Sequence, residues 1–316
     1  MGRMKSFKTI DEQIDILRDK GLTISNDDKT KEILLRENYF FINGYRHLLF
    51  KGPKENTFID GSSFDELYAL FCFDRNIRNV MFKYLLIVEN NLKSIFSYHL
   101  SGKYGYKEKE YLKMSNFVTD ISKRRQVADV INKMKRQIKT NATQHAATQH
   151  YVNNYGYIPL WVLVKVLSFG IVSELFSVLK KEDQYEIVDL YDLDIDVFSN
   201  YLVILSNYRN LCAHEDIMFD NRTQKYINDT KYHRILNIPM MDNEFIYGKN
   251  DLYALVIILK SLLKDNEVKD MINEVDKAIS NLEFNLRSIP IDKVLDRMGF
   301  PNNYMDIVDI EKKELF

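Results

Sequence analysis

Residues 64–94 read FDELYALFCFDRNIRNVMFKYLLIVENNLKS, and this stretch decides the fold class. Apolar side chains recur every three or four residues and continue to Gly102, which is the spacing of one face of an α-helix. Ser63 and Glu66 have the spacing of a capping box, so the helix is expected to begin directly after Ser63. The pattern predicts a long amphipathic helix with a wide buried stripe.

Helical periodicity also marks most of the remaining chain. A short helix is expected after the capping-box pair Thr9 and Glu12, and a second over residues 31–41, KEILLRENYFF, with a break at Asn43-Gly44. Five further segments show the same period: 115–140, 160–180, 197–217, 251–264 and 266–287. All five prolines fall between these segments, where they break no helix. Strand patterns are scarce apart from a small hairpin within residues 218–250, so we expect a mainly α fold.

The chain divides into three parts on this pattern. An N-terminal helical region over residues 1–60 is expected to pack on a main helical domain over residues 61–287, and residues 288–316 form a C-terminal tail. Residues 141–159 read NATQHAATQHYVNNYGYIP and contain ATQH twice, with little that could form a core. A mobile loop is therefore expected near residues 141–158.

Composition limits the class of protein. The 316 residues are 46% hydrophobic and 28% charged, which is enough to bury a large core. No run of 18 apolar residues lacks a charge, and the N-terminus is polar, so neither a membrane span nor a signal peptide is expected and a cytoplasmic location is predicted. Cys72 and Cys212 lie inside apolar helical patterns, which favours buried thiols over a disulfide or a metal site.

Charge is uneven although the net charge is only −1. Residues 103–140 carry eleven basic against four acidic residues, and a partner rich in phosphate would suit this segment. The alternative is a solvated helix face, because exposed Lys and Arg are the ordinary surface of a helix. The candidate RNA-binding residues are Lys123, Arg124, Arg125, Lys133, Lys135 and Arg136.

A second stretch, SNYRNLCAHEDIMF at residues 206–219, places Arg209, Asn210 and His214 in an apolar helical segment. Asn210 and His214 are four residues apart and share a helix face, while the long side chain of Arg209 can reach the same patch. A guanidinium binds phosphate oxygens and an imidazole titrates near neutrality, as metal-free phosphodiester cleavage requires. The alternative is that Arg209 pairs with a carboxylate such as Glu89 and that His214 is a helix-end histidine. The chemistry of these residues leaves both interpretations open.

Other enzyme classes lack their motifs in this sequence. There is no Gly-rich phosphate loop followed by Lys and Ser or Thr, no Gly-x-Ser-x-Gly elbow and no zinc-protease His pair. His145 and His150 are five residues apart without a nearby Cys or carboxylate, a poor arrangement for metal ligands. We expect neither a metal nor another cofactor.

The spacing Arg209-Asn210-x-x-x-His214 resembles the motif of HEPN-type ribonucleases, in which Arg and a polar residue precede His by the same interval. Further blocks occur in the matching order, among them TIDEQIDILRDKGLTI at residues 9–24, YFFINGYRHLL at 39–49 and YIPLWVLVKVLSFGIVSELF at 157–176. Together with residues 64–94, they resemble bacterial abortive-infection Abi proteins of the AbiD and AbiF kind over roughly residues 5–225. One departure is that Glu215 and Asp216 follow the His, where this family often has a basic or polar run.

The resemblance implies a HEPN-like helical bundle with additional helices at both ends, in which the helices at residues 64–100 and 197–217 form the core pair. It implies a dimer in which two motifs face each other. His214 would transfer protons, Arg209 would stabilise the phosphorane and Asn210 would orient the imidazole. Supporting polar positions of the family pattern match Arg75, Arg78, Glu89 and Lys93.

The function implied by the resemblance is that of an antiphage abortive-infection toxin, a metal-independent endoribonuclease restrained by a small structured RNA. The expected partners are RNA, as substrate and as antitoxin, and a second copy of the chain in a homodimer or a higher even oligomer. Neither membrane nor DNA is expected as a partner. Two alternatives remain: a catalytically inactive HEPN-fold RNA-binding or regulatory module, and a helical scaffold that binds other proteins.

Overall fold

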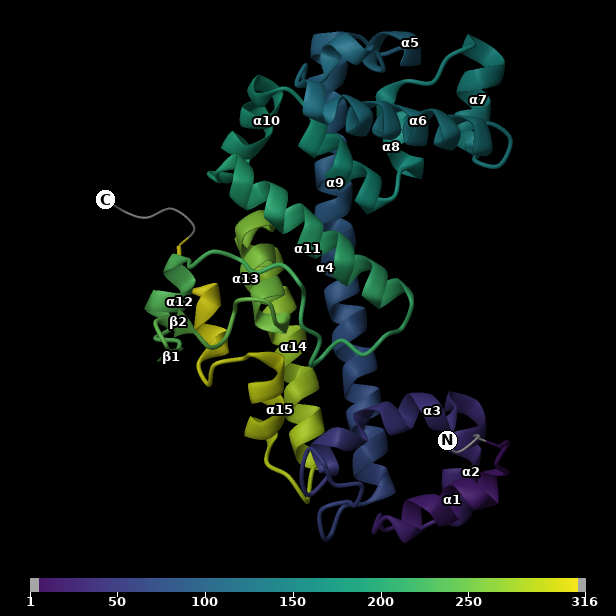
Figure 1. The fold of residues 1–316 in the computed structure, drawn as a ribbon, viewed down its shortest axis with the longest axis vertical. Helices are drawn as coiled ribbons and strands as arrows, with labels where there is room; N and C mark the ends of the chain where they lie inside the picture. Colours follow the sequence, from purple (N-terminus) through teal and green to yellow (C-terminus); the bar gives the residue numbers. More distant parts are fainter. Residues whose placement is uncertain (1–5, 312–316) are drawn as a thin grey trace.

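Helix α4 (Phe64–Tyr104) runs along the length of the molecule, and the other helices are arranged around it (Figure 1). This is seen in a computed structural model that describes residues 6–311. The Ser63 hydroxyl accepts a hydrogen bond from the Glu66 amide, as the sequence predicts. The Glu66 carboxylate does not complete the capping box, because it accepts hydrogen bonds from the backbone of Arg287 and Ser288 instead. The helix is therefore tied at its start to the C-terminal part of the chain.

The N-terminal helices lie beside the first turns of α4 (Figure 1). They are α1 (Ile10–Asp19), α2 (Asp27–Glu37) and α3 (Tyr39–Ile42). The capping box of Thr9 and Glu12 is confirmed. The single helix expected over residues 31–41 is wrong: the chain turns at Asn38, whose φ is +67°, and the Asn38 amide oxygen caps α3. Asn tolerates this left-handed conformation better than most residues do, which explains the break.

Four helices form a lobe at the far end of α4 (Figure 1). They are α5 (Glu108–Tyr111), α6 (Arg124–Asn141), α7 (Ala146–Tyr155) and α8 (Leu160–Val166). Helix α7 corrects the loop expected near residues 141–158. It is capped by the His145 ring, which accepts from the Thr148 amide, and it ends at Gly156 with φ of +70°. Aromatic contacts along residues 150–157 supply the packing that the polar composition of this segment concealed.

Three helices lead from this lobe back across α4: α9 (Phe169–Val178), α10 (Lys181–Val188) and α11 (Ile195–Ala213). The helix expected over residues 160–180 is two helices, because the chain is extended at Leu167 and the Ser168 hydroxyl then caps α9. Helix α11 ends four residues earlier than the sequence pattern suggested. It packs on α4, so the expected core pair of helices is present.

The C-terminal part contains α12 (Lys231–Ile235), α13 (Leu252–Leu262), α14 (Asp265–Asn285) and α15 (Ile291–Met298). Strands β1 (Met240–Met241) and β2 (Glu244–Phe245) pair antiparallel, which confirms the small hairpin. Short 3-10 segments complete the secondary structure at Asn43–Leu49, Met114–Asn116, Ile121–Lys123, Asp189–Tyr191 and Tyr304–Val308. The part of the expected C-terminal tail that the structure describes contains α15, and Val294, Met298 and Phe300 in it are buried.

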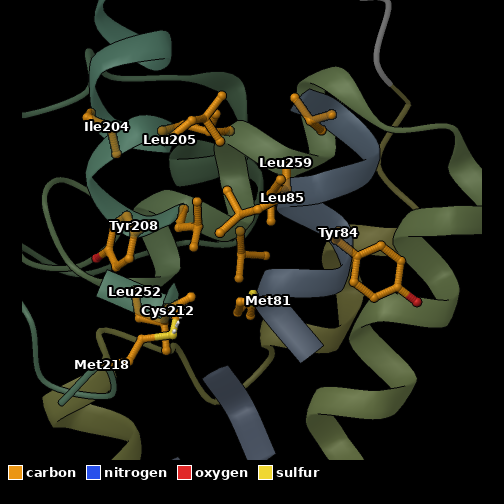
Figure 2. Close-up of a cluster of buried hydrophobic side chains, with 14 of the residues drawn as sticks. Met81, Tyr84, Leu85, Ile204, Leu205, Tyr208, Cys212, Met218, Leu252 and Leu259 are labelled. Atoms are coloured by element: carbon orange, nitrogen blue, oxygen red, sulfur yellow. Dashed lines mark hydrogen bonds between the residues drawn. The ribbon is translucent and has the colours of Figure 1, made fainter. Parts of the chain in front are cut away.

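The core lies where α4, α11 and α13 meet. Figure 2 shows Met81 and Leu85 of α4 pointing toward Leu205 of α11, with Leu252 and Leu259 of α13 closing the cluster. The mainly α fold predicted from the periodicity is confirmed. Within residues 6–311, no helix has both the length and the apolar character needed to cross a membrane.

Candidate active site at the end of helix α11

Arg209 of α11 and Lys93 of α4 share one buried carboxylate. Arg209 Nε donates to Glu89 Oε2 at 3.3 Å, and Lys93 Nζ donates to Glu89 Oε1 at 2.7 Å. Glu89 is 3% exposed, whereas the Arg209 side chain is 29% exposed. The ion pair with Glu89 anticipated as an alternative is therefore present. We name these three residues the α11 triad.

The α11 triad carries one more positive than negative charge. Arg209 uses only its Nε in the contact with Glu89, and its two terminal amino groups make no hydrogen bond within the described residues. A guanidinium fork with free N–H groups binds the oxygens of a phosphate or carboxylate well. The triad thus holds Arg209 in place and leaves its outer donors available to an anion.

Asn210 and His214 lie exposed at the last turn of α11. The His214 amide donates to the Asn210 carbonyl at 3.0 Å, but among residues 6–311 neither side chain makes a hydrogen bond. The contact between the amide and the imidazole that the spacing suggested is absent from the single chain. The His214 ring is consequently free to meet a substrate or a second copy of the chain.

The chain leaves α11 through a left-handed residue. Glu215 has φ of +56°, its amide donates to the Cys212 carbonyl, and the Asp216 amide donates to the Leu211 carbonyl. These two hydrogen bonds form a Schellman motif, in which glycine usually occupies the left-handed position. The motif fixes the direction of the chain directly after His214.

A second buried cluster, Asp74 with Arg78 on α4, holds the segment after the motif. Asp74 is fully buried and accepts from the Tyr45 hydroxyl, the Arg78 guanidinium and the amides of Met218 and Phe219, at 2.7–3.2 Å. Burial raises the pKa of Asp74, although the Tyr45 hydroxyl and the Arg78 charge oppose that effect. Arg78 also donates to the Asp216 carbonyl at 2.9 Å. We call this cluster the α4 anchor, and it keeps Arg78 away from solvent.

Arg75 is committed to a carboxylate as well. It donates to both oxygens of Glu37 on α2, at 3.2 and 2.6 Å, and its guanidinium lies 4.6 Å from the Phe71 ring centre. The hydrogen bond with Glu37 raises the pKa of Arg75, and the charge of Glu215 adds to that effect. The acidic residue after His214 therefore lies in the field of Arg75, which offsets part of its repulsion toward a phosphate.

The six candidate RNA-binding residues of the 123–136 segment do not all carry free charge. Lys133 is neutralised by Asp129 and Glu174, at 2.8 and 2.7 Å, and Lys123 donates to the Ser177 carbonyl at 3.2 Å. The other four are exposed and form no ion pair within residues 6–311: Arg124, Arg125, Lys135 and Arg136. These four remain the basic face of α6, which lies in the α5–α8 lobe (Figure 1).

Sequence reasoning missed two residues that position this site. Asp74 was an available signal, because a carboxylate four residues before Arg78 interrupts an otherwise apolar stripe. Tyr45, which donates to Asp74 and stacks on Phe219 at 5.8 Å, offered no local signal, since the contact joins segments far apart in the chain.

Comparison with known proteins gives one result. A family model described as Abi-like protein matches residues 32–220, which is more than half of the chain and includes the α11 triad and the α4 anchor. No characterised protein and no solved structure matches significantly. Abi-like proteins are associated with abortive infection, a form of phage defence, and the chain belongs to the Abi-like protein family.

Proposed function

We propose that the protein is an abortive-infection endoribonuclease of the HEPN type that cleaves RNA without a metal ion. One observation carries the proposal: the α11 triad presents the free donors of Arg209 on the helix whose last turn exposes His214. An anion-binding guanidinium and a titratable imidazole are the groups that phosphodiester cleavage needs. Family membership supports the defence role.

The reaction is an internal transfer at phosphorus. One imidazole takes the proton of the ribose 2′-hydroxyl, the 2′-oxygen forms a bond to phosphorus, and the bond from phosphorus to the 5′-oxygen breaks. A proton must then reach the leaving 5′-oxygen, and the products are a 2′,3′-cyclic phosphate and a 5′-hydroxyl. Arg209 stabilises the negative charge that accumulates on the phosphorane oxygens.

A single chain supplies one His214, whereas this reaction uses a base and an acid. The exposed residues Val203, Asn207, Asn210 and His214 follow one another at intervals of four, three and four, so they share a face of α11. A second copy packed on this face about a twofold axis would bring two sets of Arg209 and His214 together. The proposed active enzyme is therefore a homodimer, in which Asn210 positions the imidazole.

The proposed restraint is a small structured RNA that binds the basic face of α6. Its four unpaired cations suit phosphate contacts. Expression of the intact chain in bacteria should inhibit growth, and DNA from beside the gene should relieve that inhibition if it encodes such an RNA. If flanking DNA does not relieve the growth inhibition, the proposed restraint by a small RNA is wrong. The proposed RNA cleavage is not affected by that result.

The test of the reaction uses purified protein and labelled RNA in the presence of EDTA. His214→Ala and Arg209→Ala should each reduce cleavage by about 100-fold or more, which is the usual contribution of general acid–base catalysis. His99→Ala, a partly buried histidine elsewhere on α4, is the control and should cleave normally. Thermal unfolding of each variant verifies the fold.

The expected product ends in a 2′,3′-cyclic phosphate. If His214→Ala cleaves like the parent, or if cleavage needs an added divalent metal, this mechanism is wrong. RNA binding that persists without any cleavage would favour the inactive RNA-binding module.

A further inference from the structure

An unbroken series of aromatic rings crosses the surface of the α5–α8 lobe. Each ring lies 5.3–6.2 Å between centroids from the next, which is the range of stacked and edge-to-face contacts. The members, which we call the aromatic platform, are Trp161, Tyr106, Tyr157, Tyr155, Tyr151 and His150.

The platform is open to solvent. Tyr155 is 56% exposed, Trp161 46% and Tyr106 42%. Large aromatic side chains usually bury most of their area in a core or an interface, so several half-exposed rings in contact mark a binding surface. The platform belongs to a different lobe from the α11 triad, and nothing in the proposed cleavage reaction uses it.

Charge around the platform favours an anionic ligand. Residues 130–173, which include α7 and α8, contain no Asp or Glu, although the whole chain has 45 acidic residues among 316. The nearby acid Glu108 is engaged, since it accepts from the Ile158 amide at 2.9 Å. Lys107 Nζ lies 5.7 Å from the Tyr106 ring centre and 5.3 Å from that of Tyr157. A ligand on these rings thus meets a cation and no free carboxylate from that segment.

Helix α6 packs against both α7 and α8, so its exposed basic face lies in the same lobe as the platform. A ligand that extends from the rings toward α6 would gain the charges of Arg124, Arg125, Lys135 and Arg136. Flat groups for the rings, joined by negative charges for the cations, are what a single nucleic acid strand offers.

We infer that the aromatic platform binds single-stranded RNA, with bases stacked on its rings and phosphates directed to Lys107 and the basic face of α6. The choice of RNA rests on the proposed function, while the platform itself rests on the ring contacts and on the absence of acids from residues 130–173. Unpaired bases expose the faces that aromatic side chains stack on, and duplex RNA does not. The platform would therefore hold an unpaired segment of the substrate or of the restraining RNA.

Trp161 provides a direct test, because it is the single tryptophan of the sequence. Oligo(A) of about 12 nucleotides, a length within the usual range of single-strand sites, is titrated into the full chain. The oligonucleotide carries 2′-O-methyl groups, so it lacks the hydroxyl that cleavage needs. Stacking should quench the indole emission saturably, whereas an RNA duplex of equal length and inorganic polyphosphate should leave the emission unchanged.

Tyr106→Ala and Tyr157→Ala should each weaken binding of the same oligonucleotide by about fivefold or more. Tyr185→Ala is the matched control, since Tyr185 is 63% exposed on α10, outside the platform. Unfolding temperatures exclude a loss of fold. Unchanged affinity in both platform variants, or no quenching by single strands, would overturn the inference.

The same titration distinguishes RNA from a peptide ligand, and it tests the platform independently of the proposed cleavage. Quenching by a proline-rich peptide but not by RNA would assign the platform to protein recognition and overturn the inference. Failure of the platform leaves the effect of His214→Ala on cleavage intact. Conversely, quenching by the uncleavable strand persists even if His214 proves irrelevant to catalysis.

Discussion

Helix α4 carries two buried ion pairs of the same design, and they differ in net charge and in access to solvent. In the α4 anchor, Asp74 accepts four donors and Arg78 divides its hydrogen bonds between Asp74 and the Asp216 carbonyl. In the α11 triad, one carboxylate serves two cations, and Arg209 reaches solvent. The anchor is neutral and closed, whereas the triad is positively charged and open.

This difference separates residues that hold the site from residues that can react. A neutral cluster that is shut off from solvent fixes the chain around it but offers a ligand no accessible charge. A cluster with surplus charge and free donors attracts an anion. The resemblance to the family placed Arg78 and Lys93 in one supporting set. The net charge of each cluster and its exposure to solvent tell the two clusters apart.

The largest expected effect contrasts Asp74→Ala with Arg209→Ala. Removing Asp74 leaves Arg78 buried without its partner, which should lower the free energy of unfolding by about 3–5 kcal/mol. Removing Arg209 leaves Glu89 paired with Lys93 and should cost about 1 kcal/mol or less, because Arg209 is partly exposed. Urea unfolding measures both values. Equal losses in the two variants would abolish the distinction between anchor and triad.

The next largest expected effect comes from preventing dimerisation, because the proposed cleavage needs His214 from two copies of the chain. Val203→Glu places a charge on the exposed face of α11, where Val203 is 38% exposed. The variant should be monomeric by light scattering and should lose cleavage by about 100-fold or more. A monomer that cleaves normally would show that one chain suffices.

The basic face of α6 permits a test of free against neutralised charge. Changing Arg124, Arg125 and Arg136 to Glu should weaken RNA binding and reduce the slope of affinity against salt concentration by about one unit for each phosphate that the variant no longer binds. Lys133→Gln is the control, because Asp129 and Glu174 already neutralise Lys133. If Lys133→Gln reduces the salt slope of RNA binding as much as the substitution of one of these arginines does, ion pairing within the protein does not determine which basic residues bind RNA.

Much of the fold was predictable because it depends on local patterns. Apolar spacing gave α4, and the hydroxyls of Thr9 and Ser63 marked helix starts. The breaks at Asn38 and Leu167 were not predictable, since each depends on one residue leaving the helical conformation within a segment of continuous helical periodicity. Helix α7 was missed because its segment is mostly polar and its ring contacts, within residues 151–157 and from Tyr157 to Tyr106, follow no apolar helical period.

The candidate site was predictable to a smaller extent. The motif named Arg209 and His214, and Glu89 was anticipated as the ion-pair alternative for Arg209. Spacing also suggested that Asn210 holds the imidazole, but helical residues four apart share a face without being obliged to bond, and the side chains do not. Whether a polar side chain is buried against a partner or reaches solvent depends on tertiary contacts, and helical periodicity in the sequence does not reveal those contacts.

A third buried polar cluster surrounds His233, which is neutral in the folded protein. His233 is fully buried, its Nε2 lies 3.0 Å from the Gly248 carbonyl and its Nδ1 accepts from the Thr230 amide. Burial lowers the pKa of His233 below its usual 6.5. The unfolded chain therefore takes up this proton first, and stability should fall as pH drops below about 6.5, by at most about 1.4 kcal/mol per pH unit.

Asp251 opposes this trend at lower pH. Burial raises the pKa of Asp251 to about 6, so the folded chain binds that proton more readily than the unfolded chain, and stability rises as pH falls from about 6 toward 3.8. Comparing the parent with His233→Gln by urea unfolding at several pH values isolates the histidine. The difference between them should shrink as pH falls from 7 toward 5, and a constant difference would contradict the neutral buried state.

The smallest expected effect lies at the junction between the open and closed clusters, at Glu215. Glycine relieves the left-handed strain at φ of +56°, so Glu215→Gly should stabilise the protein by about 0.5–1 kcal/mol, less the weak attraction to Arg75. Removal of the carboxylate next to His214 should also strengthen RNA binding. Glu215→Ala removes the same charge but keeps the strain, so it should strengthen RNA binding without raising stability. If both variants bind RNA like the parent, the acidic residue after His214 does not weaken the approach of phosphate, and Arg75 alone is sufficient to screen it.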